Sequence, residues 1–196
     1  MIIVRHRVNT ISDLSTIPSS QGVEIDIRSN GGELIIQHDP FKDGEYLNDW
    51  ISLFHHRLLI LNVKEDGLED RIIDALSAIG RVSYFFLDQS FPSFFKLSKV
   101  RPEACSIRAS EFESLELGIA LQPGWVWFDS HIGNWDYLSK SFDMLRGTQI
   151  KTCLVSPELQ RQDCDGELAY LKSKIYNESI SFDAVCTKRP AFWQES

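Results

Sequence analysis

The feature that most constrains the fold is a regular alternation of short apolar runs with longer amphipathic segments. The apolar runs are four to seven residues long and rich in β-branched and aromatic side chains, as buried parallel strands are. Eight such runs occur, at residues 2–5, 23–28, 58–64, 84–88, 104–108, 125–130, 150–155 and 184–187. Their alternation with helical segments predicts an α/β fold with a parallel sheet.

The segments between these runs are the expected helices. In residues 68–79, apolar side chains recur at three- and four-residue spacing, which gives a helix one apolar face. Capping residues precede several segments, such as Ser110 before residues 111–121 and Asn134 before residues 135–145. The remaining expected helices are residues 10–17, 47–55, 92–100 and 167–176.

Eight strands are also the number that closes a barrel. We therefore predict a compact (β/α)₈ TIM barrel with short loops, as one domain over residues 1–196. The alternative is an open, doubly wound sheet, for which a glycine-rich turn is expected after the first strand. Residues 6–9 offer no glycine at that place, which favours the barrel.

A small β-hairpin excursion is expected after the second strand. Residues 23–28 alternate, so that Glu24 and Asp26 share one face. Residues 29–32 read Ser-Asn-Gly-Gly, a turn sequence, because glycine readily adopts positive φ. Residues 33–39 then return as a second strand, which would carry His38 back toward the two carboxylates.

Composition excludes several partners. The net charge is −8 and no cluster of lysine and arginine forms the basic face that nucleic acid or an anionic membrane would require. No stretch approaches the roughly 20 apolar residues of a membrane span, and the first apolar run is too short for a signal peptide. The cysteines lack metal-ligand spacing and are expected to be buried thiols, which favours a reducing, cytoplasmic compartment. They are Cys105, Cys153, Cys164 and Cys186.

Several short motifs follow one another along the chain. They are His6-Arg7 with Asn9-Thr10, Glu24-Ile-Asp26, His38-Asp39, Leu61-Asn62-Val63-Lys64 and, near the end, Thr187-Lys188-Arg189-Pro190. In this order they resemble the glycerophosphodiester phosphodiesterase family, which reads His-Arg-Gly, Glu-Asn-Thr, Glu-x-Asp, His-Asp, carboxylate-x-Lys and Thr-Asp-x-Pro. The resemblance implies a TIM barrel, and a phosphoric diester hydrolase that acts on a small glycerophosphodiester-like substrate.

The motif residues have the chemistry that phosphodiester cleavage needs. One group must take a proton from the attacking oxygen and another must protonate the leaving oxygen, and histidine titrates near neutral pH. His6 and His38 are the expected pair, with acid and base unassigned. Arg7 and Lys64 would neutralise charge on the phosphate oxygens. The attacking oxygen is either water or a neighbouring hydroxyl of the substrate.

The two carboxylates predict a metal site. Glu24 and Asp26 side by side would repel each other unless they share a hard divalent cation, Mg²⁺ or Ca²⁺, which would polarise the phosphoryl group. Asn62 stands where the family has a third acidic ligand, and an amide oxygen brings no charge. Val8 and Lys188 are further departures, replacing a glycine and an acid of the motifs. They indicate weaker metal binding, a changed substrate or lost catalysis.

Four further residues are candidates for holding the substrate. Trp127 and Asp129 share a face near the end of the sixth strand, while Arg108 and Lys188 end the fifth and eighth. Core packing of the tryptophan, a capping role for the aspartate and solvated charge for the two cations are the alternatives. The His55-His56 pair follows the second helix and is therefore expected at the bottom of the barrel, in a structural role.

Three functional hypotheses remain open. The first is a metal-assisted phosphodiesterase whose partner is a small soluble diester, because short loops leave little material to grip a phospholipid. The second, motivated by Asn62, is a barrel that binds a phosphorylated ligand, for example in surface-polysaccharide metabolism, without cleaving it. The third is a barrel of another reaction type, such as a sugar phosphate isomerase.

Overall fold

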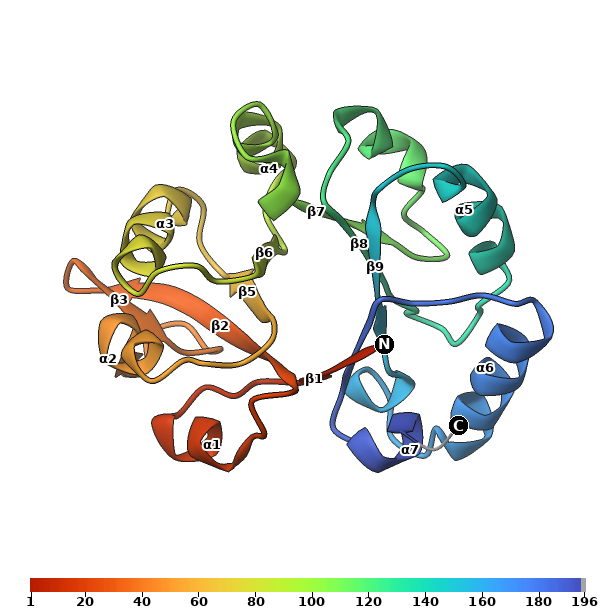
Figure 1. Ribbon diagram of the computed structural model, residues 1–196, viewed down its shortest axis with the longest axis horizontal. Coiled ribbons are helices and arrows are strands. Elements are labelled where there is room, and N and C mark those ends of the chain that lie inside the picture. Colours follow the sequence, from red (N-terminus) through yellow and green to blue (C-terminus); the bar gives the residue numbers. More distant parts are fainter. Residues whose placement is uncertain (195–196) are drawn as a thin grey trace.

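Parallel strands form the centre of the molecule in the computed structural model, which describes residues 1–194 (Figure 1). The last two residues of the predicted domain lie outside this range. The parallel strands are β1 (Ile2–Arg5), β2 (Gly22–Asn30), β5 (Leu59–Val63), β6 (Tyr84–Leu87), β7 (Ser106–Ala109), β8 (Trp125–Phe128), β9 (Lys151–Val155) and β10 (Ala184–Thr187). All eight predicted strand positions are confirmed, with ends that shift by at most two residues.

Neighbouring strands follow one another in the order β7-β8-β9-β10-β1-β2-β5-β6. Between β6 and β7 the contact narrows to one isolated parallel bridge from Phe86 to Cys105. Beside it, the Ser106 hydroxyl donates to the Phe86 carbonyl at 2.6 Å. The two ends of the sheet therefore meet, although no continuous ladder joins them.

The predicted hairpin excursion is confirmed. Strand β3 (Glu33–Ile36) pairs antiparallel with β2, and β4 (Glu45–Tyr46) pairs antiparallel with β3. Gly31 and Gly32 hold φ values of 58° and 91° at the turn, a conformation that glycine adopts without steric cost. The return strand ends at Ile36, earlier than predicted, so His38 lies in the loop that follows it.

Helices surround the strands (Figure 1). They are α1 (Ile11–Thr16), α2 (Leu47–Ser52), α3 (Glu69–Ala78), α4 (Phe91–Ser98), α5 (Tyr137–Leu145), α6 (Asp165–Asn177) and α7 (Pro190–Gln194). Within residues 1–194, no helix combines the length and apolarity that a membrane crossing requires.

One predicted helix is wrong. Residues 111–121 contain only two short 3₁₀ turns, η2 (Leu115–Leu117) and η3 (Ile119–Leu121). The Ser110 side chain closes a local turn instead of capping a helix, donating to the Glu113 carboxylate at 2.8 Å. Glu111 is held across the barrel top, where its carboxylate accepts from the backbone N–H groups of residues 131 and 132, each at 3.0 Å. These contacts with the next loop outweigh the helical pattern.

The barrel interior is mainly apolar. Its buried cluster takes alternate residues from most of the parallel strands, which is the expected pattern for a closed barrel. The cluster comprises Val4, Leu58, Ile60, Phe85, Leu87, Trp125, Trp127, Cys153, Val155, Ala184 and Cys186. The four cysteines are free and buried, as predicted.

Candidate active site

Three predicted metal ligands lie on the neighbouring strands β2 and β5. Glu24 and Asp26 are 1% and 0% exposed, and the apolar residues that alternate with them pack outward against the surrounding helices. The two carboxylates therefore face the barrel interior. The parallel register of β2 and β5 places Asp26 opposite Asn62, which is also buried. The structure thus brings these three side chains together.

The loop after β1 delivers His6 and Arg7 to the same carboxylates. Arg7 lies in the left-handed region, at φ 53°, and this turn lets its backbone N–H donate to Glu24 Oε2 at 2.7 Å. Its side-chain Nε lies 3.8 Å from Asp26 Oδ2. His6 Nε2 lies 3.8 Å from Glu24 Oε2. One backbone turn therefore positions a cation and an imidazole beside the acidic pair.

Asp26 is clamped from two sides. Asn9 Nδ2 donates to Asp26 Oδ2 at 2.8 Å, and the Asp26 N–H donates to Asn9 Oδ1 at 3.0 Å. Lys64 Nζ lies 3.2 Å from Asp26 Oδ1 and 3.8 Å from Asp88 Oδ2. Sequence reasoning used Asn9 only as a motif residue and missed this positioning role, as well as Asp88, whose place directly after a strand was the available signal.

The hairpin brings His38 into the site through Arg7. Arg7 Nη2 and His38 Nε2 are 2.7 Å apart, and His38 Nδ1 is 2.9 Å from Asp39 Oδ1. Because a guanidinium only donates, Nε2 accepts and the proton of the neutral ring sits on Nδ1, facing Asp39. The hydrogen bonds from His38 and Lys42 lower the pKa of Asp39 to about 2. Asp39 thereby fixes the orientation of the His38 ring.

Burial shifts the pKa values of two site residues in opposite senses. Burial, and then the neighbouring Asp26 charge, raise the pKa of Glu24 to about 7, against hydrogen bonds from the Arg7 backbone and Asn62. Burial lowers the pKa of His6 to about 4, with help from the charges of Arg7 and Lys188. At neutral pH, His6 is therefore an uncharged imidazole.

Four buried polar atoms of the site have no hydrogen-bond partner. They are His6 Nδ1, Glu24 Oε1, Asn62 Oδ1 and Asp26 Oδ1, the last of which has the Lys64 ammonium as an ion-pair partner at 3.2 Å. A buried polar atom without a partner costs about 1–3 kcal/mol, so a group of them marks a place where a ligand supplies the missing contacts.

These buried atoms also show whether the site could accommodate a metal ion. Three of them are oxygens of the kind that hard divalent cations prefer. Residues 1–194 contain no group of three His, Cys, Asp or Glu side chains placed to hold a metal ion. An amide takes the third position here, so the donor set of Glu24, Asp26 and Asn62 fits a hard cation with one charge fewer than three acids would supply.

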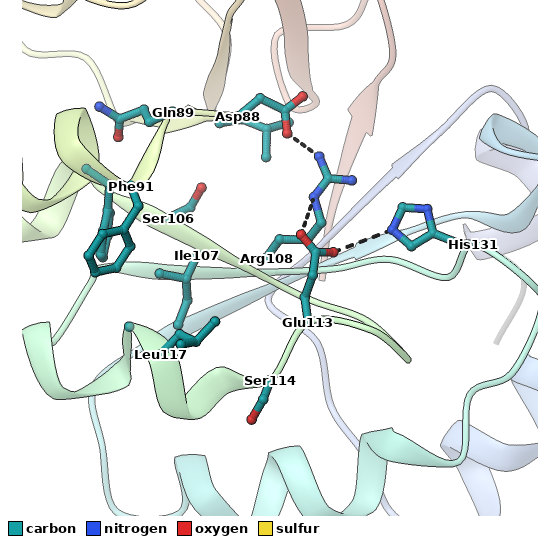
Figure 2. Close-up of a pocket in the computed structure, with 13 residues that line it drawn as sticks. Asp88, Gln89, Phe91, Ser106, Ile107, Arg108, Glu113, Ser114, Leu117 and His131 are labelled. Carbon is teal, nitrogen blue, oxygen red and sulfur yellow. Dashed lines mark hydrogen bonds and ion pairs between the residues drawn. The ribbon is translucent and has the colours of Figure 1, made fainter.

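A pocket of about 460 Å³ opens on the other half of the barrel top, among the loops after β6, β7 and β8 (Figure 2). Arg108 forms an ion pair with Asp88, and its Nε lies 3.8 Å from Glu113 Oε1. His131 Nε2 lies 3.4 Å from Glu113 Oε2. Phe91, Phe94, Ile107 and Leu117 provide apolar walls. Asp88 also approaches Lys64, so it links this pocket to the carboxylate cluster.

The other residues predicted to hold the substrate have different surroundings. Trp127 is 4% exposed and packs in the barrel interior, its ring 6.5 Å from that of Phe85. Asp129 is 1% exposed and accepts from Arg108 Nη1 at 2.7 Å and from Gln160 Nε2 at 2.8 Å. Trp127 is therefore a core residue, and Asp129 pairs with Arg108 rather than capping a helix. Lys188 is exposed, and its positive charge helps to lower the pKa of His6.

Solved structures with the same fold were found. Glycerophosphodiester phosphodiesterases from Agrobacterium tumefaciens and Thermotoga maritima match with TM-scores of 0.68 and 0.66 at 12% and 16% identity, over 100% of this chain and 100% and 97% of theirs. One from Parabacteroides distasonis matches with a TM-score of 0.67 at 14% identity, over 99% of this chain and 95% of its own. No family model and no curated protein matches the sequence. The predicted TIM barrel is thus confirmed, and the predicted resemblance holds at the level of the fold.

Proposed function

We propose that the chain is a phosphodiesterase that hydrolyses a small phosphodiester at the carboxyl ends of β1, β2 and β5. The observation that carries this proposal is the group of buried polar atoms on His6, Glu24, Asp26 and Asn62 that have no hydrogen-bond partner. Arg7 and Lys64 lie beside Asp26, and a second imidazole, His38, contacts Arg7. The fold shared with glycerophosphodiester phosphodiesterases supports the same conclusion.

Glu24, Asp26 and Asn62 would hold a divalent cation, Mg²⁺ or Ca²⁺. When bound, such a cation would supply Lewis-acid polarisation of a phosphoryl oxygen. Asn9 keeps the Asp26 carboxylate oriented for this task through its two hydrogen bonds. Lys64 places a fixed positive charge next to Asp26, which would attract the phosphate but further reduces the negative charge available to a metal ion.

The two histidines would share the proton transfers. His6 is a neutral ring whose Nδ1 is buried and unpartnered, so it is free to exchange a proton with a reacting oxygen. His38 directs its Nδ1–H at Asp39, which leaves Nε2 as its reacting atom. In the free protein Arg7 occupies that Nε2. An incoming phosphate would attract the guanidinium and release His38 for catalysis.

The pocket around Arg108 would hold one alcohol group of the diester. Lys64 contacts both Asp26 and Asp88, so a phosphate bound beside it lies at the pocket entrance. About 460 Å³ suits a small alcohol, and the apolar walls with a charged rim suit one that carries both carbon and polar groups.

A second candidate function is binding of a phosphorylated ligand without cleavage. Two observations favour it. Asn62 is an uncharged member of the ligand set, and the hydrogen bond from Arg7 leaves His38 Nε2 unavailable for proton transfer. Calorimetry with glycerophosphocholine separates the two, since a pure binder holds the diester and releases no alcohol over hours.

The direct experiment is a hydrolysis assay with bis(p-nitrophenyl) phosphate and glycerophosphocholine, with Mg²⁺, Ca²⁺, Mn²⁺ or EDTA. We expect metal-dependent release of alcohol that a Glu24→Ala/Asp26→Ala variant loses. Turnover that persists in EDTA and in this variant would contradict the assigned site. No turnover from a folded protein with any metal would move binding without cleavage to first place.

A further inference from the structure

A second polar pocket lies at the opposite end of the barrel from the candidate active site. Two loops form it, residues 54–57 before β5 and residues 79–83 before β6, so it sits at the amino ends of these strands. Its volume is about 570 Å³. The His55-His56 pair lines it, at the bottom of the barrel, where the sequence placed these histidines.

The pocket is basic in an acidic protein. Its lining includes Arg57, Arg81 and the two histidines and no carboxylate, although the chain has a net charge of −8. Both arginines are exposed. Other arginines, such as Arg108 and Arg161, pair with carboxylates, but within the part of the chain that the structure describes Arg57 and Arg81 have no ion-pair partner. Two arginines without an ion-pair partner therefore line the same concave pocket.

One lining residue, His56, is held in place and carries a buried polar atom without a hydrogen-bond partner. His56 is 8% exposed, and its Nε2 lies 3.0 Å from the Ile17 carbonyl oxygen, which can only accept. His56 Nδ1 is buried and has no hydrogen-bond partner. The rings of His55 and Phe54 pack against it, with centroids at 4.7 and 5.5 Å. The loop itself is tied down by the Arg57 N–H, which donates to the Gln21 carbonyl at 2.9 Å.

We propose that this pocket binds a small phosphomonoester. Arg57 and Arg81 hold the phosphate, because the planar fork of a guanidinium matches phosphate oxygens in pairs. Two cations select a dianion over the monoanion of a phosphodiester. The apolar side chains of Phe54 and Ile79 contact the organic part of the ligand. This assignment does not depend on the proposed function, although a phosphomonoester is the kind of product that cleavage of a diester leaves.

The test is calorimetric titration at pH 8 in EDTA, with inorganic phosphate and glycerol 3-phosphate as dianions and dimethyl phosphate as the monoanion. An Arg7→Gln/Lys64→Gln background removes the phosphate contacts of the candidate active site. We expect one site on this background, at least tenfold weaker for dimethyl phosphate. Arg57→Gln/Arg81→Gln should weaken phosphate binding at least tenfold.

An Arg101→Gln/Arg146→Gln variant removes two exposed arginines elsewhere and is the matched control, which should bind phosphate normally. Circular dichroism checks that each variant is folded. Phosphate binding that survives in Arg57→Gln/Arg81→Gln, equal binding of dimethyl phosphate, or no binding of either dianion would overturn the proposal. Because the titration measures no turnover, its outcome is separate from that of the hydrolysis assay.

Discussion

The two halves of the barrel top contain similar polar residues that have different roles. Around β1, β2 and β5, acids, an imidazole and an amide lie close together and leave four buried atoms without a hydrogen-bond partner, of which only Asp26 Oδ1 has an ion-pair partner, Lys64. Around β6, β7 and β8, Arg108 contacts three carboxylates, and Asp129 accepts from Arg108, Gln160 and a backbone N–H. A network whose polar groups are all paired stabilises the scaffold, whereas one with unpaired groups can bind a ligand. We call the half around β1, β2 and β5 the incomplete half, and the half around β6, β7 and β8 the complete half.

The largest expected effect is on catalysis in the incomplete half. His6→Ala and His38→Ala should each lower kcat by about a hundredfold to ten-thousandfold, the usual contribution of a general acid or base. Hydrolysis of bis(p-nitrophenyl) phosphate measures it. Tyr176→Ala, at an exposed position of α6, is the control and should keep near-normal turnover. Near-normal rates in both His6→Ala and His38→Ala would contradict the two-histidine mechanism.

In the complete half, the expected effect is on stability. Arg108→Gln leaves the buried Asp129 carboxylate without its cation, which should cost about 3 kcal/mol of unfolding free energy. Urea denaturation measures the loss. Arg108→Gln/Asp129→Asn removes the uncompensated charge and should recover part of it. If Arg108→Gln leaves stability unchanged, the network contributes little to the scaffold.

The pH dependence of stability is a further test of the incomplete half, because its Glu24 and His6 side chains have pKa values shifted in opposite directions. The raised pKa of Glu24, about 7, favours the folded state at low pH and loses that contribution as pH rises from about 4.5 to 7. The lowered pKa of His6, about 4, favours folding at high pH and loses it as pH falls from about 6.5 to 4. In the metal-free protein the two trends offset each other.

Single substitutions should separate these trends. In EDTA, Glu24→Gln should leave the His6 trend, so that stability rises with pH between 4.5 and 6.5, by up to about 3 kcal/mol. His6→Gln should leave the Glu24 trend, so that stability falls over the same range. Urea denaturation at stepped pH measures both slopes. Slopes of the same sign in the two variants would contradict the opposed shifts.

A smaller effect is expected from restoring the third acid. Asn62→Asp adds a negative charge to the ligand set of Glu24 and Asp26, and should raise Mg²⁺ or Ca²⁺ affinity about tenfold. In EDTA the same variant should be less stable, since three carboxylates then crowd one buried place. Calorimetry and thermal unfolding measure the two effects. An unchanged affinity would place Asn62 outside the ligand set.

Much of the incomplete half could be predicted from sequence because strand periodicity determines it. Alternation in β2 turned Glu24 and Asp26 to one face, and the Gly31-Gly32 turn returned the chain so that His38 contacts Arg7 beside them. The complete half was less predictable, since its partners come from separate loops. Nothing local to residues 111–121 reveals that Glu111 binds the next loop rather than a helix.

The most direct test of the proposed metal site is calorimetric titration of the metal-free protein with Mg²⁺, Ca²⁺ and Mn²⁺, beside Glu24→Gln and the distant Glu116→Gln control. We expect one divalent cation to bind per chain, with binding retained in Glu116→Gln and lost in Glu24→Gln. No binding of any of the three cations, or equal binding in Glu24→Gln, would contradict the claim that the orphaned oxygens of this half are metal ligands.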